Sequence, residues 1–148
     1  MSAQYFHVAR LGLSLASILM ALPAWAGHRI ESEERIVSDK GGYVASYVAR
    51  LVTLREEGRK VAFAGECDSA CTLFLALPRN QVCISPGAFF GFHAPSAPTA
   101  SGAEAAGAFM LNQYPNWVRR WIAEQGGLSA RLTLMDYSYA SQHIDPCR

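Results

Sequence analysis

An apolar run, a short polar segment and a second apolar run constrain this 148-residue chain more than any other feature. Residues 61–64 are typical of a buried strand, and residues 70–77 are typical of a helix. The segment 65–69 between them predicts a sharp strand-to-helix turn with Ser69 at the helix N-terminus. Free backbone N–H groups favour negative charge there, so a serine can act as a nucleophile beside oxyanion donors. Most serines before helices only cap them, and that simpler role stays open for Ser69.

The N-terminal residues have the composition of a secretory signal peptide. Arg10 precedes the apolar segment 11–22, and Ala24-Trp25-Ala26 has the small-x-small pattern of a cleavage site. That apolar segment is shorter than a membrane span requires. We therefore expect removal of residues 1–26 and a mature domain over residues 27–148, which is 148 − 26 = 122 residues long. The mature protein would be periplasmic or secreted, with no membrane attachment.

The charge of the mature chain excludes a nucleic-acid partner. Arg10 is the only charged residue of the expected signal peptide, so Lys plus Arg falls from 13 to 12, against 12 Asp plus Glu. A net charge of zero without a basic run gives a phosphate backbone nothing to bind. No cofactor and no metal are expected either.

Four cysteines, an even number, lie in the expected mature part: Cys67, Cys71, Cys83 and Cys147. In an exported protein this count favours two disulfides. Because the expected helix runs outward and the strand after it can return, we expect Cys83 to pair with Cys67 or Cys71, and Cys147 to pair with the other. A zinc site that includes His93 is an alternative, against which the loose Cys-x3-Cys spacing argues. A catalytic thiol is another, against which export argues.

Alternating strands and helices predict a single α/β domain with a mostly parallel sheet. Gly58 is a natural helix end, and strand-helix-strand units form right-handed crossovers, so the simplest arrangement is β-α-β-α-β followed by C-terminal helices. The expected strands are 35–38, 61–64, 81–84 and 88–92, and the expected helices are 43–57, 70–77, 103–111, one that begins at Pro115, and 129–141.

The helix after Pro115 carries an aromatic stripe that includes Tyr114, Trp117 and Trp121. Such a stripe is typical of either the core or a subunit interface. Because a chain this short buries a modest fraction of its surface, we expect a homo-oligomer with this helix near the interface.

His93 directly follows the strand expected at 88–92, 24 positions after Ser69. Most histidines after apolar strands are structural. The carboxyl ends of strands are, however, where α/β folds place their sites. Residues 94–102, with prolines and small polar residues, are expected to form a flexible loop beside it.

Three motifs together resemble the Clp protease/crotonase superfamily, in particular small exported relatives of the Clp proteolytic subunit and signal peptide peptidase A. The segment Ser38-Asp39-Lys40-Gly41-Gly42 resembles the family's Ser-Pro-Gly-Gly segment, with Lys40 in place of the proline. Gly65-x-x-x-Ser69 resembles its nucleophile turn, although the family usually has small residues before the serine. Gly91-Phe92-His93-Ala94-Pro95 resembles its strand-end histidine. The resemblance covers residues 35–125.

This resemblance implies a Clp protease/crotonase-like fold and a role for each matched residue. Ser69 would be the nucleophile and His93 the general base, with the N–H groups of Gly42 and Ala70 as the oxyanion hole. Asp136 has a suitable separation to orient His93, and it fits a solvated helix position equally well. The expected function is an exported serine hydrolase, a peptidase acting on peptide or protein substrates. The alternative is a non-catalytic module of the same fold that binds a peptide or a partner.

Overall fold

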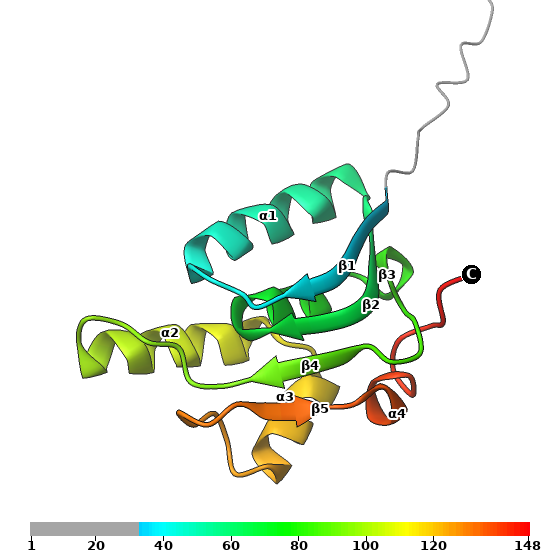
Figure 1. The fold of residues 1–148 in the computed structure, drawn as a ribbon. Helices are drawn as coiled ribbons and strands as arrows, with labels where there is room; N and C mark the ends of the chain where they lie inside the picture. Colours follow the sequence, from blue (N-terminus) through cyan, green and yellow to red (C-terminus); the bar gives the residue numbers. More distant parts are fainter. Residues whose placement is uncertain (1–32) are drawn as a thin grey trace, which may run out of the picture.

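The computed structural model describes residues 33–148 (Figure 1). The expected signal peptide and its cleavage site lie outside these described residues. Within them, none of the helices is long and apolar enough to cross a membrane.

A mixed sheet of five strands forms the centre of residues 33–148, and three of its four strand pairings are parallel. The strands are β1 (Glu33–Asp39), β2 (Lys60–Asp68), β3 (Val82–Ile84), β4 (Phe89–Phe92) and β5 (Thr133–Met135). The α-helices are α1 (Val44–Glu57), α2 (Ala100–Gln113), α3 (Asn116–Glu124) and α4 (Tyr137–Ala140), and the 3-10 helices are η1 (Ser69–Ala76) and η2 (Arg79–Gln81). The expected α/β class with a largely parallel sheet is therefore confirmed.

On the side of β2 that faces away from β1, two strands pair with it in parallel, one after the other. Its first half pairs with β3, whereas its last residues pair with β4, which places Asp68 opposite Gly91. The strand order is β1-β2-β4-β5, as the sequence of arrows below α1 in Figure 1 shows. Because β2 and β4 run in the same direction, Ser69 and His93 leave the sheet at the same edge.

The turn that carries Ser69 falls later than the sequence predicts. The strand β2 continues through Gly65 to Asp68, so the change of direction occurs at Ser69 itself. The element that follows is a tight 3-10 helix, and residues 70–75 of it are all buried. Helix η1 contacts α1, α2, β2 and β4, which makes the segment behind Ser69 the centre of the core.

The helix expected at 129–141 is wrong. Gly126 and Gly127 both have φ of 89°, a conformation that favours glycine, and the chain turns back there. Residues 133–135 then pair with β4 in an antiparallel direction, and only the short helix α4 follows. Long-range pairing with β4 decides this segment, because its leucines alone suit a helix as well as a strand.

The aromatic stripe of α3 packs inward. Trp121 is 7% exposed, and its ring and that of Tyr114 lie 5.4 Å and 5.7 Å from the ring of Phe92. Trp117 stacks on His143 at 4.7 Å. This packing favours the core role over the interface role for the stripe, so the expected place of a subunit interface on this helix is not supported.

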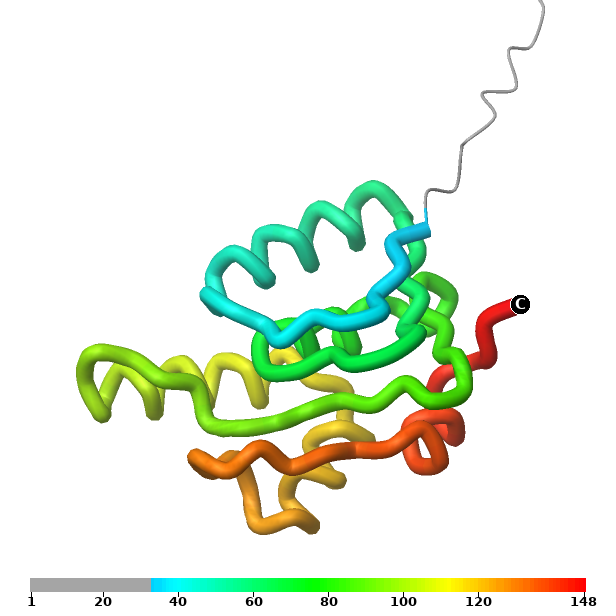
Figure 2. The backbone as a smooth tube through the Cα atoms, in the orientation of Figure 1, coloured from blue at the N-terminus to red at the C-terminus, as the bar shows by residue number. Residues whose placement is uncertain are grey.

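The expected disulfide pairing is wrong: Cys67 bonds to Cys71, and Cys83 bonds to Cys147. The tight helix η1 brings Cys71 to a Cα distance of 5.4 Å from Cys67. The C-terminal segment runs back beside β3 (Figure 2), where the N–H of Cys147 donates to the carbonyl of Ile84. Because no thiol is left free, the zinc and thiol alternatives lose their ligands and nucleophile. Two disulfides are consistent with an oxidising compartment.

Candidate active site

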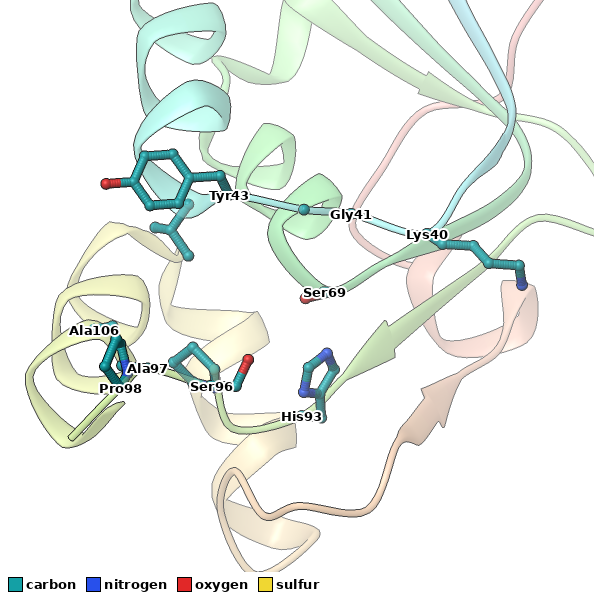
Figure 3. Close-up of a pocket in the computed structure, with 12 residues that line it drawn as sticks. Lys40, Gly41, Tyr43, Ser69, His93, Ser96, Ala97, Pro98 and Ala106 are labelled. Atoms are coloured by element: carbon teal, nitrogen blue, oxygen red, sulfur yellow. The ribbon is translucent and has the colours of Figure 1, made fainter. Parts of the chain in front are cut away.

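A cavity of about 540 Å³ opens at the sheet edge where β2 and β4 end (Figure 3). Ser69 and His93 both line it. The rest of its wall comes from residues 40–44, which join β1 to α1, from residues 95–98 after β4, and from Ala106 of α2. The structure thus brings together the two side chains that the sequence singled out, from segments 24 positions apart.

Ser69 has an unusual backbone conformation. Its φ is 56°, and among the non-glycine residues of 33–148 it alone has a positive φ. Such a conformation costs about 1–3 kcal/mol and persists only where surrounding structure imposes it. A serine held in this way on a strand-to-helix turn presents its hydroxyl at the top of the sheet, which is the geometry of a nucleophile elbow.

Two buried hydroxyls hold the backbone of Ser69 from behind. The hydroxyl of Thr72 donates to the carbonyl oxygen of Ser69 at 2.5 Å and lies 2.6 Å from the hydroxyl oxygen of Tyr114. Since the single hydrogen of Thr72 goes to Ser69, the Tyr114 hydroxyl donates to Thr72. Burial raises the pKa of Tyr114, which keeps this donor protonated. No sequence motif pointed to this pair, because the two residues are 42 positions apart.

A backbone carbonyl orients the ring of His93. The Nδ1 atom of His93 lies 2.7 Å from the carbonyl oxygen of Ala94. A carbonyl oxygen only accepts hydrogen bonds, so Nδ1 carries a proton, and Nε2 is the ring nitrogen that this carbonyl leaves available. Figure 3 shows the ring pointing toward Ser69. Among the described residues, no hydrogen bond yet joins the Ser69 hydroxyl to this ring, and such bonds often tighten only with substrate.

Gly41 allows the loop after β1 to approach Ser69 closely. Its φ is 78°, and a Cβ atom there would lie 2.6 Å from the carbonyl oxygen of Asp68 and from Cβ of Ser69. Its N–H donates to Asp39 Oδ1 at 2.9 Å. Among the described residues, the N–H of Gly42 has no backbone acceptor, and Ala70 lies in the first turn of η1, where N–H groups lack intrahelical acceptors.

Replacing Gly41 by alanine should destabilise the protein by at least about 2 kcal/mol, because the positive φ and the contact with Ser69 both exclude a side chain. Gly42→Ala is the matched control. The nearest atom to a Cβ at Gly42 is a ring carbon of Tyr47 at 3.6 Å. The free energy of unfolding of this variant should therefore lie within about 1 kcal/mol of that of the natural protein. Urea unfolding of both variants checks this expectation. Equal stability of the two would mean that the loop does not press against Ser69.

Lys40 is the other candidate base at this cavity, and its charge is already paired. Its Nζ lies 2.7 Å from Oε1 of Glu66, and this hydrogen bond raises the pKa of Lys40. A lysine with a raised pKa stays protonated and takes no proton from a serine. In Figure 3 its side chain extends away from Ser69.

The structure does not bring Asp136 to His93. Strand β5 pairs Met135 with Phe90 and Thr133 with Phe92, so Asp136 lies at the N-terminal end of β4, the opposite end from His93. His93 follows the first residue of β4 by four positions, and four residues of a strand span roughly 13 Å. Asp136 instead caps α4, and the Ser138 hydroxyl and the Tyr139 N–H lower its pKa. The assignment of Asp136 as the orienting acid is therefore corrected.

Comparison with known proteins leaves the family open. No protein-family model and no curated protein matches the chain. Among solved structures, the chain is similar to a point mutant of ClpP1 from Listeria monocytogenes, with a TM-score of 0.45 and 16% sequence identity. The match covers 74% of this chain and 68% of that chain. Similarity at this level assigns neither a family nor an activity.

Proposed function

We propose that the chain is an exported serine hydrolase that cleaves peptide or protein substrates. Residues 1–26 would be its signal peptide and residues 27–148 its mature domain, which assembles as a homo-oligomer. The observation that carries this proposal is the conformation of Ser69, a strained serine at a strand-to-helix turn that shares a cavity with His93.

The reaction uses groups that the cavity provides. Nε2 of His93 takes the proton of the Ser69 hydroxyl as Oγ attacks the substrate carbonyl carbon. The N–H groups of Gly42 and Ala70 donate to the resulting oxyanion. When the tetrahedral intermediate collapses, the bond to the leaving amine breaks and His93 gives its proton to that amine. Water then attacks the acyl group on Ser69 while His93 takes a proton from the water. His93 returns this proton to Ser69 Oγ as the bond to the acyl group breaks and the acid leaves.

The lining favours a substrate with an apolar group near the scissile bond. Among the described residues, Lys40 is the only Lys, Arg, Asp or Glu in the cavity wall, and Glu66 neutralises its charge. Beside the cavity, between α1 and α2, lies an apolar hollow of about 370 Å³, which is lined entirely by apolar or aromatic residues. Its residues are Tyr43, Val44, Ala45, Val48, Ala106 and Phe109.

One observation favours the alternative, a non-catalytic module that binds a peptide or partner in the same cavity. Within residues 33–148 the Ser69 hydroxyl has no hydrogen bond to His93, and a carbonyl rather than a carboxylate receives Nδ1–H. If the hydrogen bond between Ser69 and His93 does not form with substrate either, the cavity would bind a peptide without cleaving it.

A fluorophosphonate probe separates the two functions. The natural protein should be labelled at Ser69, and Ser69→Ala should lose the label. Ser96→Ala is the matched control, because Ser96 lines the same cavity and is exposed, and this variant should keep the label. Mass spectrometry of the labelled peptide locates the adduct. Absence of labelling in the natural protein between about pH 6 and 9, the range in which a histidine base is active, would favour the binding module.

A further inference from the structure

Asp68 is a buried acid next to the proposed nucleophile. It is 6% exposed, and its Oδ1 has no hydrogen-bond partner among the described residues. Burying a carboxyl oxygen without a partner is unfavourable, so this atom calls for an explanation beyond the hydrogen bond of the Asp68 carboxyl group with Glu66. Asp68 precedes Ser69 directly and lies opposite Gly91, two residues before His93.

The neighbouring strand leaves room for this carboxyl group. A Cβ atom on Gly91 would lie 2.2 Å from Oδ1 of Asp68, so any side chain at Gly91 would displace the carboxyl. The side chain of Asp68 therefore lies across β4, close to the start of the segment that carries His93.

A second cavity connects Asp68 with His93. It measures about 400 Å³ and is lined by Lys40, Asp68, His93, Ala130 and Leu132. His93 thus stands between two cavities, with Ser69 in the wall of one and Asp68 in the wall of the other. The register of β2 and β4 produces this arrangement, since it aligns Asp68-Ser69 with residues 91–93.

We propose that Asp68 is the acid of this site, a positioning residue whose carboxylate stabilises the imidazolium of His93 that forms when Ser69 gives up its proton. The carbonyl of Ala94 fixes the ring through Nδ1, and Asp68 supplies the negative charge across the second cavity. This inference rests on the proposed hydrolase function and replaces the role first expected of Asp136.

The groups around Asp68 act on its pKa in both directions. Burial, and then Glu66, raise the pKa of Asp68, whereas the positive charges of Lys40 and His93 lower it. Within residues 33–148, no other charged group lines the second cavity. A positive charge on His93 therefore favours the carboxylate of Asp68, and by reciprocity that carboxylate favours the charge on His93.

The test is the rate of fluorophosphonate labelling of Ser69 as a function of pH. In this reaction Oγ bonds to phosphorus, the P–F bond breaks, fluoride leaves and His93 holds the proton. Asp68→Asn should lower the plateau rate about 10-fold and move the acidic limb of the profile to lower pH, because the neutral amide no longer favours a positive ring. Thermal unfolding confirms that the variant is folded, and Asp68→Ser provides a second neutral variant.

Asp136→Asn is the matched control. Asparagine caps helices as well as aspartate does, so the profile of this variant should coincide with that of the natural protein. A slower plateau at an unchanged pH dependence in both Asp68 variants would assign Asp68 a purely structural role and overturn the inference alone. If the natural protein is not labelled at all, the hydrolase function and the inference fall together.

Discussion

His93→Ala should slow the labelling of Ser69 about 10²–10⁴-fold, the usual loss when a positioned general base is removed. The physical reason is that the Ser69 hydroxyl is a weak nucleophile until a base takes its proton, and His93 is the base that the cavity offers. Lys40 cannot replace it, because its pKa is raised by Glu66. The measurement is the second-order rate constant with a fluorophosphonate at pH 8.

The double variant Ser69→Ala/His93→Ala should hydrolyse a peptide substrate no more slowly than either single variant, because the two residues act as a unit. His143→Ala is the matched control for loss of a histidine. Its ring stacks on Trp117 and does not line the cavity, so this variant should keep its labelling rate while losing some stability. Additive losses from Ser69 and His93 would argue against a shared proton transfer.

We expect one disulfide to matter more for the stability of the protein and the other to matter more for the reactivity of Ser69. The bond between Cys83 and Cys147 closes a loop with a sequence separation of 64, so the Cys83→Ala/Cys147→Ala variant should lose about 4 kcal/mol of unfolding free energy. The bond between Cys67 and Cys71 has a separation of only 4 and should contribute about 2 kcal/mol. Urea unfolding measures both values.

Labelling of the same variants should show the reverse order. Cys67 and Cys71 flank Ser69 and are fully buried, so their bond fixes the short ring that holds the serine at its positive φ. Without it, the labelling rate should fall about 100-fold, the usual consequence of a misplaced reacting group. The Cys83–Cys147 variant, whose bond lies outside the cavity wall, should label normally at temperatures where it is folded. Normal labelling of both would show that packing and the Thr72 hydrogen bond suffice to hold Ser69.

The sequence alone determined the elements with strong local signals. The apolar periodicity of α1 and the left-handed glycine Gly58 at its end were predictable, because helix period and helix termination are local properties. The apolar runs of β2 and β4 were predictable for the same reason, and so was the delivery of Ser69 and His93 to one sheet edge, since parallel strands end together.

Only the tertiary structure decided what depends on long-range pairing. Whether residues 133–135 form a strand depends on their contact with β4, and that contact moved Asp136 away from His93. The disulfide partners depend on the tightness of η1 and on the return of the C-terminal segment to β3. Asp68 became a candidate for the same reason. Its carboxyl group is buried because Gly91 lies opposite it, and no spacing along the chain reveals which residue a neighbouring strand places there.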